Sequence, residues 1–346
     1  ASDVGWVVGH SYICYGPLIA GITTVVFEGK PIGTPDAGTF WRVIEEHDVK
    51  SFFTAPTAIR AVKREDPKGL ERHKYNLGCL RALYLAGERA DPDTIEWAQN
   101  ILGVPIFDHW WQTETGGIMI TPIPYVTPTK PTYATLPFIG IQPCLMDENG
   151  EELKGNQVEG RLCIKFPWPS IARTIWGNHQ RYKDTYFSTF ENKYFTGDGA
   201  LRDDVGYYRI TGRVDDVIIV SGHNLGTAPI EDAINEHPAV AESAIVGYPH
   251  DVKGSALYGY VTLKDSGEGR KHDNLRKEIN QSIADRIGPI AKLDKIQFTE
   301  GLPKTRSGKI MRRILRKIAE KDTSNLGDIS TLLNPEVVQD IMDNAL

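Results

Sequence analysis

The segment Asp108–Gly117 combines residue types that could bind a nucleotide. It follows an apolar run, Val104–Phe107, that predicts a strand, and α/β sheets bind ligands beyond the carboxyl ends of their strands. The hydroxyl and N–H of Thr113 can contact a phosphate, and the Glu114 carboxylate can hold a divalent cation that neutralises phosphate charge. A core tryptophan pair before a glycine turn is the alternative, although core packing does not require Gln-Thr-Glu-Thr-Gly-Gly.

Three residues elsewhere in the chain could bind a sugar and a base. Asp198 lies between two glycines, where its carboxylate can accept both hydroxyls of a ribose, and an Asp-Gly hairpin turn is the alternative. Gly87 ends a predicted strand and would let a planar base approach the backbone, although such a glycine usually forms only a turn. Arg213 could bind ribose or phosphate, or form a surface salt bridge.

A basic segment near the end of the chain could supply a catalytic cation. Residues 302–309 precede a predicted helix, Ile310–Ala319, and their Ser-Gly turn could present Lys309 to a negatively charged reaction centre. A basic amphipathic helix for nucleic acid or membrane, or a plain solvated helix, are the alternatives. The whole chain has 39 Lys and Arg against 45 Asp and Glu, and this net charge of −6 disfavours nucleic acid and anionic lipid as partners.

The composition is that of an ordinary globular protein of about two domains, because 346 residues allow roughly 150 per domain. The 4 Cys are scattered, which indicates neither a disulfide framework nor a zinc site and fits the cytoplasm. The stretch Gly5–Phe27 has no charged residue and is long enough to cross a membrane. Its glycines, Pro17 and the lack of a basic segment before it predict instead a buried helix packed on a buried strand, Thr23–Phe27.

The elements that must position these residues form three regions. Alternating strand and helix patterns predict a parallel sheet with crossover helices up to about residue 130, and short β runs with turns then predict a small antiparallel sheet or barrel. The first region has predicted strands at Thr23–Phe27, Val49–Thr54, Leu80–Ala86 and Val104–Phe107, and helices at Thr39–His47 and Asp91–Asn100, the latter capped by Asp91 with Pro92 at its first position.

A second compact unit follows Thr211-Gly212-Arg213. Its predicted elements are strands at Val217–Val220, Ala241–Gly247 and Ala256–Leu263, a helix at Ile230–His237, and a helix with Leu275, Ile279, Ile283 and Ile287 on one apolar face. The predicted fold is therefore α/β. It comprises part of a large domain with a parallel sheet (1–130), a small β-barrel-like subdomain (131–214) and a smaller α/β, or α+β, domain (215–346).

Together these motifs resemble the adenylate-forming acyl-CoA synthetases. The likeness covers essentially the whole chain and is carried by Trp110–Gly117, Tyr194–Gly199, Thr211–Asp216, Ser221–Gly226, Pro303–Lys309 and Lys321–Gly327. Members of this family make an acyl-adenylate from ATP and a carboxylate, then swing a small C-terminal lid and transfer the acyl group to coenzyme A. The resemblance implies ATP, AMP, Mg²⁺ and coenzyme A as cofactors, and acetate as substrate. Propionate or another short acid, or a catalytically dead adenylate-binding module, are the alternatives.

The resemblance also implies roles for individual residues. Those placed at the nucleotide are Gly87, Glu88, Arg89, Asp108, His109, Trp110, Trp111, Gln112, Thr113, Asp198, Arg213 and Asn224. Lys309 stabilises charge while the carboxylate attacks the α-phosphorus, and a lysine acetylase would silence it and a deacetylase restore it. Asp215 is the implied hinge. The implied acyl pocket is Val7, Val8, Ala86 and Trp111; coenzyme A is placed at Val8, Ser221 and Ala284; and Mg²⁺ is placed at Glu114 and, through carbonyls, at Asn235, His237 and Val240.

The sequence also departs from the family pattern. Asn224 and Ala284 stand where arginine is common, Val8 replaces a common threonine and Arg89 a common proline. Ala86 leaves more room than valine would, whereas the Trp111 indole should block long chains, and one methylene changes discrimination by only about 1–3 kcal/mol. The family's phosphate loop is not found in these residues, and the chain starts without Met directly in apolar sequence. We therefore expect a fragment with little synthetase activity by itself.

Overall fold

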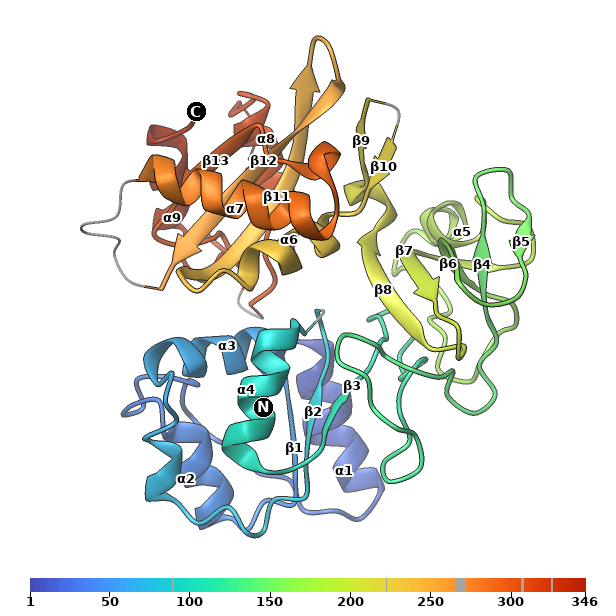
Figure 1. Ribbon diagram of the computed structural model, residues 1–346. Coiled ribbons are helices and arrows are strands. Elements are labelled where there is room, and N and C mark those ends of the chain that lie inside the picture. Colours follow the sequence, from blue (N-terminus) through green and yellow to red (C-terminus); the bar gives the residue numbers. More distant parts are fainter. Residues whose placement is uncertain (89, 222, 265–271, 306–307, 325) are drawn as a thin grey trace. The chain divides into compact units, whose positions relative to one another are not determined.

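The computed structural model describes residues 1–88, 90–221, 223–264, 272–305, 308–324 and 326–346, and its elements are labelled in Figure 1. The chain divides into two compact units, Ala1–Ile210 and Thr211–Leu346. The first unit contains a parallel and an antiparallel sheet, and the second contains one mixed sheet. The sequence-based domain limits at residues 130 and 214 stay predictions.

The first unit contains the predicted parallel sheet in the order β1-β2-β3. Its strands are β1 (Ser51–Thr54), β2 (Ala82–Leu85) and β3 (Ile106–Asp108), and its helices are α2 (Thr39–Glu46), α3 (Pro56–Glu65), η2 (Arg72–Lys74) and α4 (Pro92–Leu102). The Asp91 carboxylate accepts the N–H of Thr94 at 2.8 Å and Pro92 begins the helix, so the predicted cap is confirmed. Leu83 and Leu85 of the sheet pack with Ile59 and Ile95 in one buried core.

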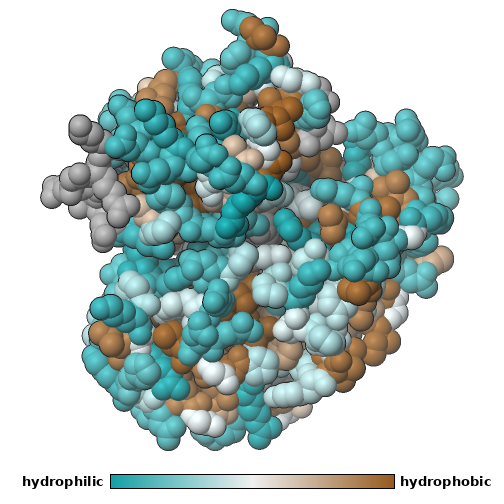
Figure 2. Space-filling model, in the orientation of Figure 1, coloured by the Kyte–Doolittle hydropathy of each residue, from teal (hydrophilic) through white to brown (hydrophobic). Residues whose placement is uncertain are grey.

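The uncharged segment near the beginning of the chain differs from its prediction. It forms a π-helical turn, η1 (Gly9–Tyr15), and a short helix, α1 (Gly16–Ile19), in which Gly9 is the one buried residue. Residues 23–27 form no strand, because none of the described strands pairs with them, and Val26 is 85% exposed. Figure 2 shows apolar surface over this unit. No described helix is long and apolar enough to cross a membrane.

The second sheet of this unit is antiparallel, as predicted for the region after residue 131. Its strands are β4 (Pro143–Met146), β5 (Glu152–Leu153), β6 (Val158–Ile164), β7 (Tyr194–Arg202) and β8 (Tyr208–Arg213), and helix α5 (His179–Tyr186) lies between β6 and β7 in the sequence. The strand order β5-β4-β6-β7-β8 is linear, so the predicted barrel-like subdomain takes the form of an open sheet in the described residues.

The second unit builds one sheet with a helical layer on each face. Its strands are β9 (Ile218–Val220), β10 (His223–Leu225), β11 (Val240–His250), β12 (Gly254–Leu263) and β13 (Lys295–Phe298). Its helices are η3 (Val214–Asp216), α6 (Thr227–Asn235), α7 (His272–Arg286), η4 (Pro289–Ala291), α8 (Arg312–Ala319) and α9 (Glu336–Asp343). Successive side chains of a strand point to opposite faces, so Leu257 packs in the core with α6 and α7 and Tyr258 in the core with α8 and α9.

The long helix of this unit follows its predicted apolar pattern over three of the four positions. Leu275, Ile279 and Ile283 are buried in α7. Ile287 lies just beyond the end of the helix and is exposed, contrary to the prediction. The chain turns there at Gly288, whose φ of 126° is unfavourable for other residues, so the helical spacing no longer applies.

Candidate active site

The buried Asp198 carboxylate is the centre of a polar cluster in the first unit. Asp198 lies in β7, and its Oδ2 accepts hydrogen bonds from Nε1 of Trp110 at 3.0 Å and Nε2 of Gln112 at 2.9 Å. The Tyr194 hydroxyl donates to Oε1 of Gln112 at 3.0 Å, which orients the amide. The structure thus brings the end of β3 and strand β7 together and holds an ionisable carboxylate in a fixed direction.

Glu114 and Thr113 continue this cluster. The Tyr186 hydroxyl donates to Oε1 of Glu114 at 2.8 Å, and the Tyr186 ring stacks on Tyr194 with centroids 5.3 Å apart. Oε2 of Glu114 has no hydrogen-bond partner among the described residues, and Thr113 is exposed. The described part of the chain holds no group of three His, Cys, Asp or Glu suited to a metal ion. A cation on Glu114 would therefore take further ligands from phosphate and water, as Mg²⁺ commonly does.

A steric restriction explains why the segment Asp108–Gly117 has glycine at position 116. The carbonyl of Thr115 accepts hydrogen bonds from Nε1 of Trp168 and Oγ of Ser170, both at 2.8 Å. Gly116 has φ +68°, and a Cβ there would lie 2.3 Å from the carbonyl oxygen of Ser170. Any other residue would clash with backbone, so Gly116 lets the turn pack closely under the site.

His109 is buried among aromatic rings beside this cluster. Its ring stacks on Phe53 with centroids 5.5 Å apart, and Nδ1 lies 3.4 Å from the Thr121 hydroxyl. Nε2 is buried without a hydrogen-bond partner among the described residues. Burial lowers the pKa of His109 from 6.5 to about 4, so the imidazole is neutral near pH 7.

This burial predicts a pH dependence of stability. The unfolded chain binds a proton on His109 near pH 6.5 and the folded chain only near about 4, so stability falls by about 1.4 kcal/mol per unit as the pH drops between them. Between about pH 7.5 and 4.5, the free energy of unfolding should fall by about 3 kcal/mol more in the wild-type chain than in His109→Gln. Urea unfolding followed by tryptophan fluorescence tests this, because all 7 Trp lie in the first unit. Equal losses in the two proteins would contradict it.

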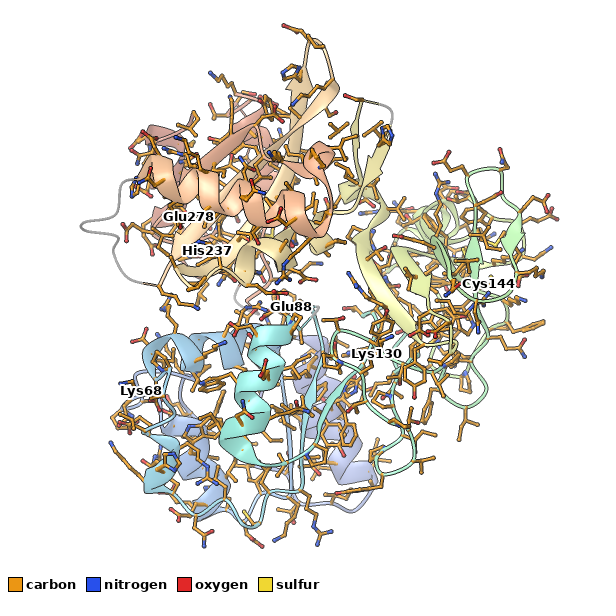
Figure 3. The ribbon with its side chains drawn as sticks, viewed as in Figure 1. Lys68, Glu88, Lys130, Cys144, His237 and Glu278 are labelled. Carbon is orange, nitrogen blue, oxygen red and sulfur yellow. The ribbon has the colours of Figure 1, made fainter. Side chains whose placement is uncertain are left out.

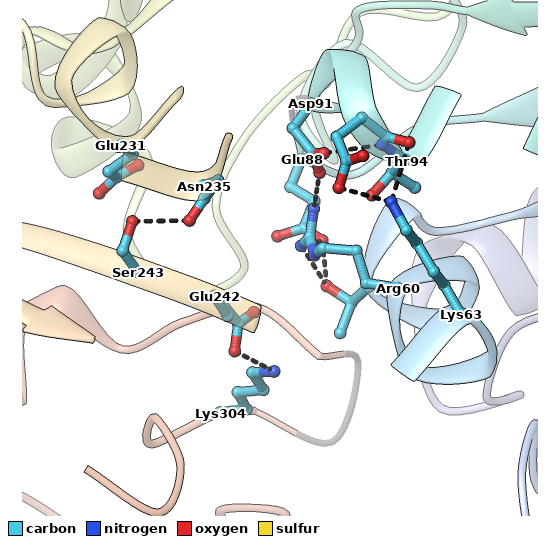
Figure 4. A network of polar contacts seen from close by, with 12 residues as sticks. Arg60, Lys63, Glu88, Asp91, Thr94, Glu231, Asn235, Glu242, Ser243 and Lys304 are labelled. Carbon is cyan, nitrogen blue, oxygen red and sulfur yellow. Dashed lines mark hydrogen bonds and ion pairs between the residues drawn. The ribbon is translucent and has the colours of Figure 1, made fainter. Parts of the chain in front are cut away.

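The segment predicted to border a base lies directly after β2. Gly87 is exposed with φ +102°, and the Glu88 carboxylate binds the Thr57 hydroxyl and the Arg60 guanidinium (Figure 4). Nη1 of Arg60 also reaches the Asp91 carboxylate at 3.2 Å, so helix α3 holds both ends of this loop. Arg89 lies outside the described residues, and Asp108, at the end of β3, lines a small cavity with Ile95, Gln99 and Tyr133.

The four residues predicted for an acyl pocket belong to one apolar cluster. Ala86 and Trp111 are buried in it, and Val7 and Val8 pack against it. The structure adds Tyr12, whose ring meets the Trp111 indole edge-on with centroids 5.0 Å apart. Sequence reasoning missed Tyr12, whose one signal was its place in the uncharged segment with Val7 and Val8.

The predicted hinge, Asp215, and two of the three residues predicted for coenzyme A, Ser221 and Ala284, lie in the second unit, whereas Val8 lies in the first. Nη2 of Arg213 lies 3.6 Å from the exposed Asp215 carboxylate, and Arg316 on α8 donates to the Asp215 carbonyl at 3.2 Å. Ser221 is exposed with φ +49°, and Ala284 is half-buried on α7. The side chain of Asn224 lies outside the described residues, although its backbone belongs to β10.

The turn after α6, predicted to hold Mg²⁺ through carbonyls, has a compact internal structure. The His237 carbonyl accepts the N–H of Val240 at 2.9 Å, and Oδ1 of Asn235 accepts the Ser243 hydroxyl at 2.8 Å. Nε2 of His237 lies 3.3 Å from Oε2 of Glu278 on α7 (Figure 3). The metal role of this turn stays a prediction.

Lys309 lies at the end of a tight turn before α8. The N–H of Thr305 donates to the Lys309 carbonyl at 2.9 Å, and the N–H of Lys309 donates back to Oγ1 of Thr305 at 3.1 Å. Residues 306 and 307 lie outside the described residues. Lys309 is exposed and forms no ion pair with the part of the chain that the structure describes, as suits a cation presented to a ligand.

Fold and motifs define an AMP-binding enzyme, and the chain belongs to that family. Residues 1–176 match the family model described as AMP-binding enzyme, and residues 229–309 match the one described as AMP-binding enzyme C-terminal domain. The fold is that of adenylate-forming ligases: the crystal structure of the anthranilate CoA ligase AuaEII in complex with anthranoyl-AMP matches with a TM-score of 0.81, at 24% identity over 93% of this chain and 59% of that chain.

Among curated proteins, the chain is similar to acetyl-coenzyme A synthetases. It is 55% identical over 349 residues to that of Rhodobacter capsulatus, covering 100% of this chain and 52% of the relative. It is 54% identical to that of Brucella anthropi and 55% identical to that of Methylobacterium radiotolerans, in each case over 99% of this chain and 52% of the relative. The chain therefore spans about half the length of the curated relatives it matches.

Proposed function

We propose that the protein containing this chain is an AMP-forming acetate–CoA ligase. It would convert ATP, acetate and coenzyme A to acetyl-CoA, AMP and pyrophosphate through acetyl-adenylate. The observation that carries this proposal is the Asp198 carboxylate, buried in β7 and oriented by Trp110 and Gln112 from the segment after β3. The 55% identity to an acetyl-coenzyme A synthetase supports acetate as the acid.

In this proposal each site residue has a separate role in the first half-reaction, the formation of acetyl-adenylate. Asp198 accepts the ribose hydroxyls, Gly87 borders the base, and the exposed Thr113 contacts the α-phosphate. An oxygen of acetate bonds to the α-phosphorus while the bond to the leaving pyrophosphate breaks, and Lys309 offsets the charge that develops. Mg²⁺, held through Glu114, would neutralise phosphate charge.

In the second half-reaction, the coenzyme A sulfur loses its proton and bonds to the acyl carbon while AMP leaves. Residues 211–346 would act as a lid that turns at Asp215 between the two steps, with Ser221 and Ala284 facing coenzyme A. Asp215 is an exposed residue in the short turn η3, which supports this role, because a hinge must change its φ and ψ.

The acyl pocket leads to a testable size limit. Trp111 and Ala86 are buried in one cluster, so the indole should occupy the space that a longer acid needs. Trp111→Ala should lower activity with acetate and raise that with butyrate relative to acetate by at least about tenfold, since each methylene is worth about 1–3 kcal/mol. Adenylate formation with acetate, propionate and butyrate measures the change. Trp176→Ala, which removes a tryptophan side chain that is 97% exposed, is the control, and an unchanged preference in Trp111→Ala would contradict the pocket.

Two experiments test the proposed function. Calorimetry with AMP and with a nonhydrolysable acetyl-adenylate mimic asks whether this chain holds the nucleotide, and the absence of heat would contradict the Asp198 site. Pyrophosphate release from a protein that contains this chain, compared for acetate, propionate and butyrate, identifies the acid. The small Ala86 side chain favours propionate as the second candidate. Binding without any turnover would indicate an adenylate-binding module, which Asn224 and Ala284 would suit.

Other partners follow from the same proposal. The exposed Lys309 is accessible to a lysine acetylase, and its acetylation would remove the charge that adenylation requires. The cytoplasm is the proposed location, because scattered free cysteines fit a reducing compartment.

A further inference from the structure

We propose that Glu242 is a positioning residue for Lys309, acting through an ion pair with Lys304 that fixes the turn presenting the catalytic lysine. This inference rests on the proposed function, because it assumes that Lys309 acts in adenylation. All the groups involved lie in the second unit, and Figure 4 shows the pair joining β11 to the segment before the turn.

The Lys304–Glu242 pair lies in an environment where lysine is uncommon. Nζ of Lys304 is 2.7 Å from Oε2 of Glu242, and the two side chains are only 18% and 13% exposed. Most lysine side chains reach into water. A pair so far removed from water contributes little net stability compared with apolar side chains, because desolvation offsets the attraction. Its distinct contribution is therefore a fixed geometry.

The backbone of Lys304 is held as firmly as its side chain. Its N–H donates to Oδ1 of Asn334 at 3.1 Å, and its carbonyl accepts the N–H of Leu333 at 2.8 Å. Lys304 and Ile310 form a β-bridge across the turn. Lys309 is the neighbour of Ile310, so a shift of Lys304 would be transmitted directly to the catalytic lysine.

The other limb of the turn is fixed in a similar way. Nη2 of Arg312 donates to both carboxylate oxygens of Glu231 on α6, at 2.8 and 2.7 Å. Oε1 of Glu231 also accepts the N–H of Ile245 in β11 at 2.9 Å. Glu242 on β11 and Glu231 on α6 thus hold the segments on either side of Lys309. Positioning of this kind matters because a misplacement of 1 Å can cost about 10²-fold in rate.

The test separates positioning from folding with a charge-neutral double variant. Lys304→Met with Glu242→Gln removes the ion pair without leaving a buried charge unpaired. In a protein that contains this chain and catalyses both half-reactions, we expect pyrophosphate release from ATP and acetate to fall at least tenfold. Acetyl-CoA formation from supplied acetyl-adenylate should stay within twofold, because it does not use the Lys309 turn. Arg276→Gln, which breaks an ion pair on α7, is the control and should change neither step.

A charge-swapped variant, Glu242→Lys with Lys304→Glu, keeps the proposal testable if the charge-neutral double variant does not fold. It keeps an ion pair between the same positions, so adenylation should recover to within about threefold of wild type, whereas Glu242→Lys alone should not recover. If the double variant does not fold, recovery in the swapped variant supports the proposal and its absence overturns it. Unchanged adenylation in a folded double variant, or equal loss of both half-reactions, also overturns it.

Lys309→Ala, measured in parallel, keeps this inference separate from the proposed function. If Lys309→Ala retains adenylation, the proposed role of the lysine fails. If Lys309→Ala loses adenylation while the double variant retains it, only the positioning role of Glu242 fails.

Discussion

Replacing Lys309 with alanine is expected to lower adenylation by at least about 10³-fold while sparing transfer of the acyl group from supplied acetyl-adenylate to coenzyme A. A single cation that stabilises charge during phosphoryl-type transfer contributes about 10³–10⁵-fold to the rate. Lys309 suits this role because it is exposed at the end of a tight turn and forms no ion pair with the described residues. The two half-reactions should be measured separately, in a protein that contains this chain and catalyses both.

Two further variants sharpen this experiment. Lys309→Arg keeps the positive charge but changes its shape and reach, so it should retain more adenylation than alanine does. Lys317→Ala on α8 removes a lysine that pairs with Asp322 at 3.3 Å and should leave both half-reactions unchanged. A loss of both half-reactions in Lys309→Ala to the same extent would show that the lysine does not act in adenylation alone.

Replacing Asp198 with asparagine is expected to weaken binding of AMP to this chain by about 100-fold. Each hydrogen bond to a charged group contributes about 1.5–3 kcal/mol, and a ribose offers two hydroxyls to this carboxylate. A loss of about 3 kcal/mol corresponds to about 100-fold in affinity. Asparagine has nearly the same shape, and its amide oxygen can still accept the Trp110 indole N–H, so the change acts mainly on the charge. Calorimetry with AMP measures the affinity of both proteins.

The ligand supplies the control for this experiment. AMP that lacks the 2′ and 3′ hydroxyls should bind wild type and Asp198→Asn equally, because neither protein can then use the carboxylate. Asp203→Asn replaces another buried carboxylate of the same unit, bound to Lys130, and should leave AMP affinity unchanged. Equal binding of ordinary AMP by Asp198→Asn and wild type would remove Asp198 from the ribose site.

Local features of this protein could be predicted from the sequence because short-range physical chemistry controls them. The cap at Asp91, the beginning of α4 at Pro92 and the buried face of α7 each depend on residues within one or two helical turns. The segment Asp108–Gly117 could be placed after a strand for the same reason. The order of several such motifs along the whole chain indicated the family that the comparisons show. Helix α3, which holds Glu88 through Arg60, was not expected, although Pro56 at its first turn was a signal.

Contacts between distant segments could not be predicted in this way. The run Thr23–Phe27 has the composition of a strand, but a strand forms only where a neighbour accepts its hydrogen bonds. The bond from Gln112 to Asp198 and the pair of Lys304 with Glu242 each join residues more than sixty positions apart. Residue types and spacing along the chain therefore determined which chemistry was available. The pairing of β3, β7 and β11 with their neighbours determined which side chains meet. Strands pair with segments that are distant in the sequence, and the local residue pattern does not specify which segment that is.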